Sequence, residues 1–189
     1  MAEAEFTMSL PARTENDADP AVADVLRAAR AAMGMIPNMY ANMANVPGLL
    51  QTYRTGYDAF RSDSDLTPVE QEVVFLTISR LNGCRYCVAA HSAVADMSQV
   101  PEAVTADLRA GTPLADAKLQ ALTRFTTTMV ESRGLPTRAD ATAFIDAGYT
   151  ERHMLHVLLA IAVKTISNYS NHLFHTPLDA VFAHRVWED

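Results

Sequence analysis

Apolar residues recur at helical spacing along most of the chain. The first such stretch consists of Val22, Val25, Leu26, Ala29 and Met33. Apolar side chains three or four residues apart form one face of a helix, and Gly34 follows as a stop. The same pattern predicts further helices over residues 38–45, 49–60, 67–81, 84–97, 101–110, 114–133, 137–148 and 150–173, and a last short one after Pro177.

The turn residues sharpen this prediction. Thr67-Pro68-Val69-Glu70 is the strongest helix start, because Thr67 can cap the helix, Pro68 suits its first position and Glu70 can close a capping box. The polar stretch Arg61–Leu66 before it is expected to be a loop. No segment alternates polar and apolar residues as a half-buried strand does. We therefore predict an all-α fold, a helical bundle in a single domain.

Composition is consistent with one domain. The chain has 189 residues, of which 49% are hydrophobic, enough for a sizeable core. Residues 1–18 are expected to form an N-terminal arm, loosely ordered or wrapped around a partner subunit, and residues 19–189 the helical domain.

Charge and hydropathy exclude several function classes. The net charge is −7 and no basic block occurs, which argues against binding nucleic acid or an anionic membrane surface. The longest apolar run, Met154–Val163, is too short to cross a bilayer. No secretory signal is visible at the N-terminus. We expect a cytoplasmic protein, in a compartment where thiols stay reduced.

The chain has two cysteines, Cys84 and Cys87. A disulfide that closes so short a loop cannot staple a fold, so the pair indicates chemistry. Together with His91 they fall on one face of the predicted helix. A helix start lowers the pKa of a thiol there, and His91 can take or give its proton. Helix geometry alone leaves either cysteine as the nucleophile.

Glu72 lies on the preceding helix. The break at Asn82-Gly83 allows that helix to fold back and bring Glu72 towards His91. The carboxylate would then orient the imidazole and favour its protonated form. Such a relay suits peroxide reduction, in which a thiolate attacks the O–O bond and the resulting sulfenic acid condenses with the neighbouring thiol.

These residues carry a resemblance. Three parts of the sequence resemble the AhpD-like branch of the carboxymuconolactone decarboxylase superfamily. They are the spacing Glu-x11-Cys-x2-Cys-x3-His, the run Leu-Thr-Pro-Val-Glu-Gln-Glu-Val-Val around Glu72, and the later stretch from Asn168 to Asp179. The core of the match covers residues 35–110.

The resemblance implies an all-α fold that assembles as homo-oligomers, trimers or hexamers. It also implies a cofactor-free thiol peroxidase acting on alkyl hydroperoxides or hydrogen peroxide, with a thiol or a lipoyl-bearing protein as reductant. By position, Cys87 is the peroxidatic cysteine, Cys84 the resolving one, and Glu72 and His91 the proton relay. The founding peroxidase has His where this chain has Tyr86, which can donate a hydrogen bond but is no base near neutral pH.

Other interpretations of the same residues stay open. The fold could host a lyase acting on a lactone acid, with His91 and Glu72 as acid–base groups. The cysteines could instead serve a redox-sensing or zinc-holding module, although structural zinc usually takes four ligands from two Cys/His pairs. We expect no metal and no cofactor.

Three further groups of residues have less specific interpretations. His153, His156, His172 and His175 are expected to pack or to lie on the surface. Asn168 and Asn171 are expected to form a polar network, within the chain or at a subunit interface. Tyr53, Tyr57 and Phe60 are expected in the core. The methionines favour core or interface filling, with the wall of a hydroperoxide pocket as the alternative; they are Met33, Met35, Met39 and Met43.

Overall fold

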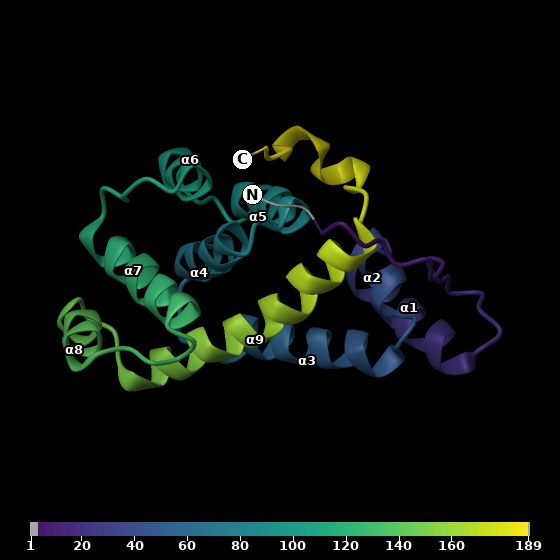
Figure 1. Cartoon of the computed structure of the whole chain (residues 1–189), viewed down its shortest axis with the longest axis horizontal. Coiled ribbons are helices and arrows are strands. Elements are labelled where there is room, and N and C mark those ends of the chain that lie inside the picture. The colour runs from purple at the N-terminus through teal and green to yellow at the C-terminus, as the bar shows by residue number, and fades with distance from the viewer. Residues whose placement is uncertain (1–3, 189) are drawn as a thin grey trace.

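A computed structural model describes residues 4–188, and the regular structure in that range is entirely helical (Figure 1). Its elements are α1 (Pro20–Met33), α2 (Asn38–Met43), α3 (Pro47–Asp63), α4 (Pro68–Leu81), α5 (Arg85–Met97), α6 (Glu102–Ala110), α7 (Ala117–Glu131), α8 (Arg138–Asp146), α9 (Glu151–Phe174) and the 3-10 helix η1 (Ala180–Arg185). The predicted all-α, single-domain fold is confirmed.

Helix α4 forms the centre of the domain. Every residue from 70 to 79 is buried, because the helix packs against α5, α6, α7 and α9. The predicted capping box begins it: Glu70 N donates to Thr67 Oγ1 at 3.2 Å, and Thr67 N donates to Glu70 Oε2 at 2.9 Å. This start places Glu72 in the core, one turn into the helix.

Helices α3 and α9 run past each other at close range, with α9 as the long diagonal rod of Figure 1. A Cβ atom added to Gly56 of α3 would lie 2.8 Å from a methyl carbon of Val163 on α9. The missing side chain therefore allows the two helices to approach. This contact holds the C-terminal half of α9 against the elements that carry the cysteines.

Two boundaries differ from the sequence-based prediction. Helix α3 continues through Asp63, so Arg61 is helical and not part of a loop. Helical geometry points Arg61 back towards Tyr57, one turn earlier, and its Nη2 donates to the Tyr57 hydroxyl at 2.8 Å. Helix α7 is shorter than predicted, because Asp116 caps its start and its side chain accepts from Leu119 N.

The segment before α1 lies against the rest of the chain. Met8 N donates to Leu173 O at 2.8 Å, and Arg13 N donates to Ala41 O at 2.9 Å. These bonds attach the segment to the end of α9 and to α2, and Figure 1 shows it crossing both.

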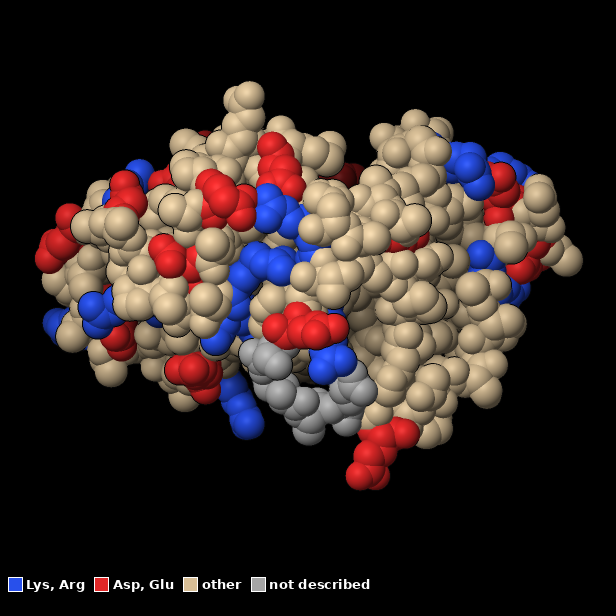
Figure 2. Space-filling view, turned by 90° about the horizontal axis from the view of Figure 1, so that it is seen from above, with Lys and Arg blue, Asp and Glu red and all other residues tan. Residues whose placement is uncertain are grey.

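The surface carries mixed charge. Acidic and basic side chains lie next to one another over much of the face in Figure 2, beside a broad uncharged area. Over residues 4–188, no helix is both long and apolar enough to cross a membrane.

Candidate dithiol site

The two cysteines lie at the start of α5, as their spacing predicts. Cys84 is the N-cap residue, and its sulfur accepts from the backbone N–H of Cys87 at 3.4 Å. Gly83 makes the turn from α4 with φ of 66°, a conformation that glycine adopts without steric penalty. Both thiols are free and buried.

Helix α9 supplies the other side of the pair. Asn171 Nδ2 lies 3.2 Å from Cys87 Sγ and 3.7 Å from Cys84 Sγ, so a single amide group contacts both sulfurs. Ser167 Oγ lies 3.9 Å from Cys87 Sγ. Asn168, on the same face, accepts from Asn82 Nδ2 at 2.9 Å. The predicted network of Asn168 and Asn171 therefore exists, and within this chain it surrounds the dithiol.

The two thiols differ in acidity. Burial alone would raise the pKa of Cys87, but a hydrogen bond from Cys84, the positive charge of Lys164 and a hydrogen bond from Asn168 outweigh burial and hold that pKa well below the usual range of a thiol. Burial and the hydrogen bond with Cys87 raise the pKa of Cys84 well above that range. Cys87 is thus the more acidic thiol of the pair, and Cys84 the less acidic one.

Glu72 and His91 meet in the core as predicted. His91 Nδ1 lies 2.9 Å from Glu72 Oε2, and the Glu72 side chain is fully buried. Arg61 completes the group, since its Nη2 donates to Glu72 Oε1 at 2.5 Å while its guanidinium lies over the rings of Tyr57 and Phe75. Burial raises the pKa of Glu72, but His91 and Arg61 outweigh burial and hold the pKa below its usual range.

His91 is neutral, and not protonated as expected from the carboxylate alone. Burial lowers its pKa and the charge of Lys164 lowers it further, and together they outweigh Glu72, which raises it. A neutral imidazole that donates Nδ1–H to Glu72 has its lone pair on Nε2. His91 can therefore accept a proton at Nε2 while it stays anchored to Glu72.

A cavity of about 260 Å³ reaches Cys87 and His91 from the surface. Most of its wall is aromatic or apolar, and the residues that matter below are Tyr40, Tyr53, Tyr57, Met39, Tyr86 and Lys164. Met33 also borders it, whereas Met43 is buried in the core. The methionine cluster is thus divided between the two roles proposed for it.

Tyr86 lies beside this cavity, but its hydroxyl is turned to the C-terminal segment. It donates to Asp179 Oδ2, and Asp179 Oδ1 accepts from Asn38 N at 3.1 Å. Burial and the Asp179 carboxylate raise the pKa of Tyr86 far above its usual range. Tyr86 therefore ties α5 to α2 and to the segment before η1 as a neutral hydrogen-bond donor.

The late histidines lie apart from the dithiol. His153 accepts from Thr150 N at the start of α9, and His172 stacks on Tyr169. His175 ends α9 with φ of 46°. Across residues 4–188, no three His, Cys, Asp or Glu side chains converge in a way that could hold a metal ion.

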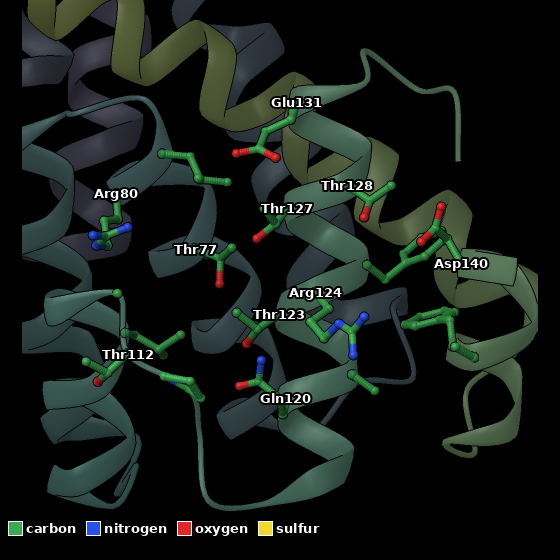
Figure 3. A pocket seen from close by; sticks show the side chains of 18 residues that line it. Thr77, Arg80, Thr112, Gln120, Thr123, Arg124, Thr127, Thr128, Glu131 and Asp140 are labelled. Atoms are coloured by element: carbon green, nitrogen blue, oxygen red, sulfur yellow. The ribbon is translucent and has the colours of Figure 1, made fainter. Parts of the chain in front are cut away.

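A second, larger cavity of about 480 Å³ lies between α4, α7 and α8 (Figure 3). Hydroxyl and charged side chains point into it, among them Thr77, Thr123, Thr127, Arg80 and Arg124. It contains neither cysteine and no histidine. Reactive groups are gathered in the smaller cavity, so we assign the candidate site there.

Comparison with known proteins agrees with this fold. The model of the carboxymuconolactone decarboxylase family matches residues 47–124. That segment runs from α3 into α7 and contains Glu72, Cys84, Cys87 and His91. No curated protein matches the sequence.

Solved structures share the fold over nearly the whole chain. A peroxidase-related protein from Ralstonia eutropha JMP134, described as an alkylhydroperoxidase AhpD core, is 19% identical and superposes with a TM-score of 0.80, covering 95% of this chain and 97% of its own. A peroxidase-related protein from Silicibacter sp. TM1040 is 23% identical, with a TM-score of 0.74 and 96% of each chain covered. The debrominase Bmp8 is 17% identical, with a TM-score of 0.68, 88% of this chain and 90% of its own covered.

The fold is therefore that of AhpD-like helical proteins. The match to the carboxymuconolactone decarboxylase family covers residues 47–124, and together with the fold it supports the predicted AhpD-like branch of that superfamily.

Proposed function

We propose that this protein is a thiol peroxidase that reduces alkyl hydroperoxides or hydrogen peroxide with Cys87 as the attacking sulfur. The observation that carries the proposal is the state of Cys87: its pKa is held well below the thiol range, and it lines a cavity together with His91. A buried thiolate beside a second thiol is the arrangement that peroxide reduction needs.

The first step joins sulfur to oxygen. Cys87 Sγ attacks the terminal oxygen of the hydroperoxide, the O–O bond breaks, and the hydroxyl stays on sulfur as a sulfenic acid. The departing alkoxide takes up one proton and leaves as an alcohol, or as water when the substrate is hydrogen peroxide. His91 relays that proton from solvent through Nε2, while Glu72 and Arg61 hold the ring in place.

The second step forms the disulfide. Cys84 is the resolving thiol, because it lies beside Cys87 where Asn171 contacts both sulfurs, and the proton that its raised pKa keeps on it is lost with the departing hydroxyl as its sulfur attacks. Its sulfur displaces the hydroxyl of the sulfenic acid, and water is released. A dithiol reductant, such as a lipoyl-type group on a protein, then donates two electrons and two protons and becomes a disulfide itself.

The test follows the thiols directly. The reduced protein is treated with cumene hydroperoxide and its mass is measured without reductant; we expect a loss of two hydrogens, mapped to the peptide that contains Cys84 and Cys87. Cys87→Ser should consume no hydroperoxide, and Cys84→Ser should stop at the sulfenic acid. Two free thiols after excess hydroperoxide would contradict the proposal.

A histidine pair supplies the matched control. His91→Asn should slow hydroperoxide reduction by about 10²–10⁴-fold, the usual contribution of a positioned acid–base group. His172→Asn changes the same residue type outside the site and should leave the rate unchanged. Equal rates in both variants would remove His91 from the mechanism.

Reductive dehalogenation is a second candidate for the same dithiol. One related structure is a Cys-to-Ala variant of the debrominase Bmp8 bound to 2,3,4-tribromopyrrole, and the cavity here has the aromatic walls Tyr40, Tyr53 and Tyr57. In this reaction a carbon-bound bromine is replaced by hydrogen, bromide is released and the two thiols become a disulfide. Bromide release from a bromopyrrole without any consumption of hydroperoxide would favour this candidate.

A further inference from the structure

Lys164 is a buried cation for which the steps above have no role. Its side chain has no solvent exposure, and its Nζ has no hydrogen-bond partner within residues 4–188. It borders the cavity that reaches Cys87 and His91. An unpaired ammonium group in the core is unfavourable unless a negative charge compensates it.

The position of Lys164 on α9 places it on the face that contacts the dithiol. Ser167 and Asn171 follow it by three and seven residues, so all three lie on one side of the helix. Ser167 and Asn171 both contact Cys87 Sγ. Lys164 therefore extends the same polar stripe by one turn towards His91.

The charges around Cys87 leave one positive charge unbalanced. The charged and titratable groups that surround Cys87 come from α2, α3, α4, α5 and α9. They are Tyr40, Tyr53, Arg54, Tyr57, Asp58, Arg61, Glu72, Cys84, Tyr86, His91 and Lys164. Among them, Glu72 forms its ion pair with Arg61. His91, the tyrosines and Cys84 are neutral. Arg54 and Asp58 of α3 carry opposite charges, so the two together add no net charge to the cavity wall, and Asp58 is exposed to solvent.

We propose that Lys164 is a positioning residue whose ammonium charge balances the Cys87 thiolate and then the negative charge that moves to the leaving oxygen. The first half concerns the resting protein alone, and the second half rests on the proposed peroxidase function. A fixed cation beside a developing negative charge stabilises it without reorganisation during the reaction. The Lys164 charge also explains why His91 is neutral despite Glu72.

The test measures the acidity of Cys87 without any hydroperoxide. In a Cys84→Ser background, which leaves one thiol, the rate of alkylation by iodoacetamide is followed against pH. Lys164→Met should move the midpoint up by about one to three pH units, the effect of an opposite charge nearby, with about tenfold slower alkylation per unit at low pH. Lys118→Met removes a half-exposed lysine elsewhere and should leave the midpoint unchanged.

Two further variants separate charge from packing. Lys164→Arg keeps the charge and should keep the low midpoint, whereas Lys164→Gln should behave like Lys164→Met. In thermal unfolding, Cys87→Ser should destabilise the protein by leaving Lys164 uncompensated, and adding Lys164→Met should recover part of that loss. Such coupling between the two positions is not expected of a lysine that only fills space.

The outcomes distinguish this inference from the peroxidase proposal. A midpoint in Lys164→Met equal to that in Lys118→Met, or strictly additive losses of stability, would overturn the role of Lys164. A shifted midpoint in a protein that consumes no hydroperoxide would support the proposed role of Lys164 and contradict the proposed peroxidase activity.

Discussion

Replacing Glu72 with glutamine tests the buried core of the site most directly. Glutamine has the shape of glutamate without its charge, so Arg61 would lose its ionic partner. The amide also brings an N–H donor towards His91 Nδ1, where a carboxylate oxygen now accepts. The imidazole would then turn to the tautomer that carries its proton on Nε2, and Nε2 could no longer accept one.

The structure sets the expected magnitudes. Breaking a buried ion pair by removing one partner costs about 3–5 kcal/mol. The Arg61 side chain is 21% exposed and Glu72 is 0% exposed, so some water reaches the arginine and we expect about 3 kcal/mol. For a chain of this length each kcal/mol lowers Tm by about 2–4 °C, which gives a drop of about 6–12 °C. Hydroperoxide turnover should fall by about 10²–10⁴-fold, because the acid–base group is in the wrong tautomer.

Thermal unfolding against pH is the assay that isolates the carboxylate. The folded pKa of Glu72 is depressed, so its contribution is complete above the unfolded value of about 4.3 and is lost as the pH falls through the folded pKa. The gap in Tm between wild type and Glu72→Gln should therefore be full at pH 7 and shrink below about pH 4. Glu131→Gln, at an exposed position, is the matched control. A Glu72→Gln variant within 2 °C of wild type at pH 7, by the scaling of about 2–4 °C per kcal/mol, would refute this reasoning.

Three more predictions follow from contacts described above. Gly56→Ala should lower the free energy of unfolding by about 1–2 kcal/mol despite the better helix propensity of alanine, because the new methyl would lie 2.8 Å from an α9 side chain. Gly48→Ala is the control, since the space around Gly48 is open and no loss is expected. Equal Tm values for the two variants would contradict the close approach of α3 and α9. The free energy of unfolding should fall as the pH drops below about 6.5, because the depressed pKa of His91 makes the unfolded state bind a proton more readily than the folded state. A His91→Asn variant whose stability depends on pH in the same way would exclude His91 as the cause. Tyr86→Phe should cost about 1–3 kcal/mol, measured by urea unfolding, because the buried Asp179 loses its side-chain donor and keeps only Asn38 N. Hydroperoxide turnover should change less than in His91→Asn, and loss of activity to the same degree would give Tyr86 a direct role.

Local signals in the sequence were enough for the helices and for half of the site. The capping box at Thr67 and the stop at Gly83 are short-range features, and they give the two helices that carry Glu72, Cys84 and Cys87. The order of these residues along two packed helices also predicts the contact between Glu72 and His91, which the structure contains.

The other half depends on contacts between distant segments. Arg61 lies on α3 and contacts Glu72 because α3 continues into the polar stretch that predicted a loop and ends at Asp63. Lys164 and Asn171 lie about two helix turns apart on α9. Both come more than 70 residues after the cysteines in sequence, and no spacing rule connects them with the cysteines. The polar residues Asn168 and Asn171 within the apolar repeat of α9 were the available signal, and they predicted a network without indicating what it surrounds, whereas nothing in the sequence analysis assigned a role to Lys164.

The way α9 closes over the cysteines has a consequence for biosynthesis. Asn171 contacts Cys87 across 84 residues of sequence, so a growing chain carries both sulfurs long before it carries the amide and the ammonium group of α9. Until α9 docks, Cys87 has Cys84 beside it but lacks the Lys164 charge and the Asn168 hydrogen bond that also lower its pKa. The full acidity of Cys87 is therefore a product of completed folding, and the sulfur of an unfinished chain has less thiolate character than that of the folded protein.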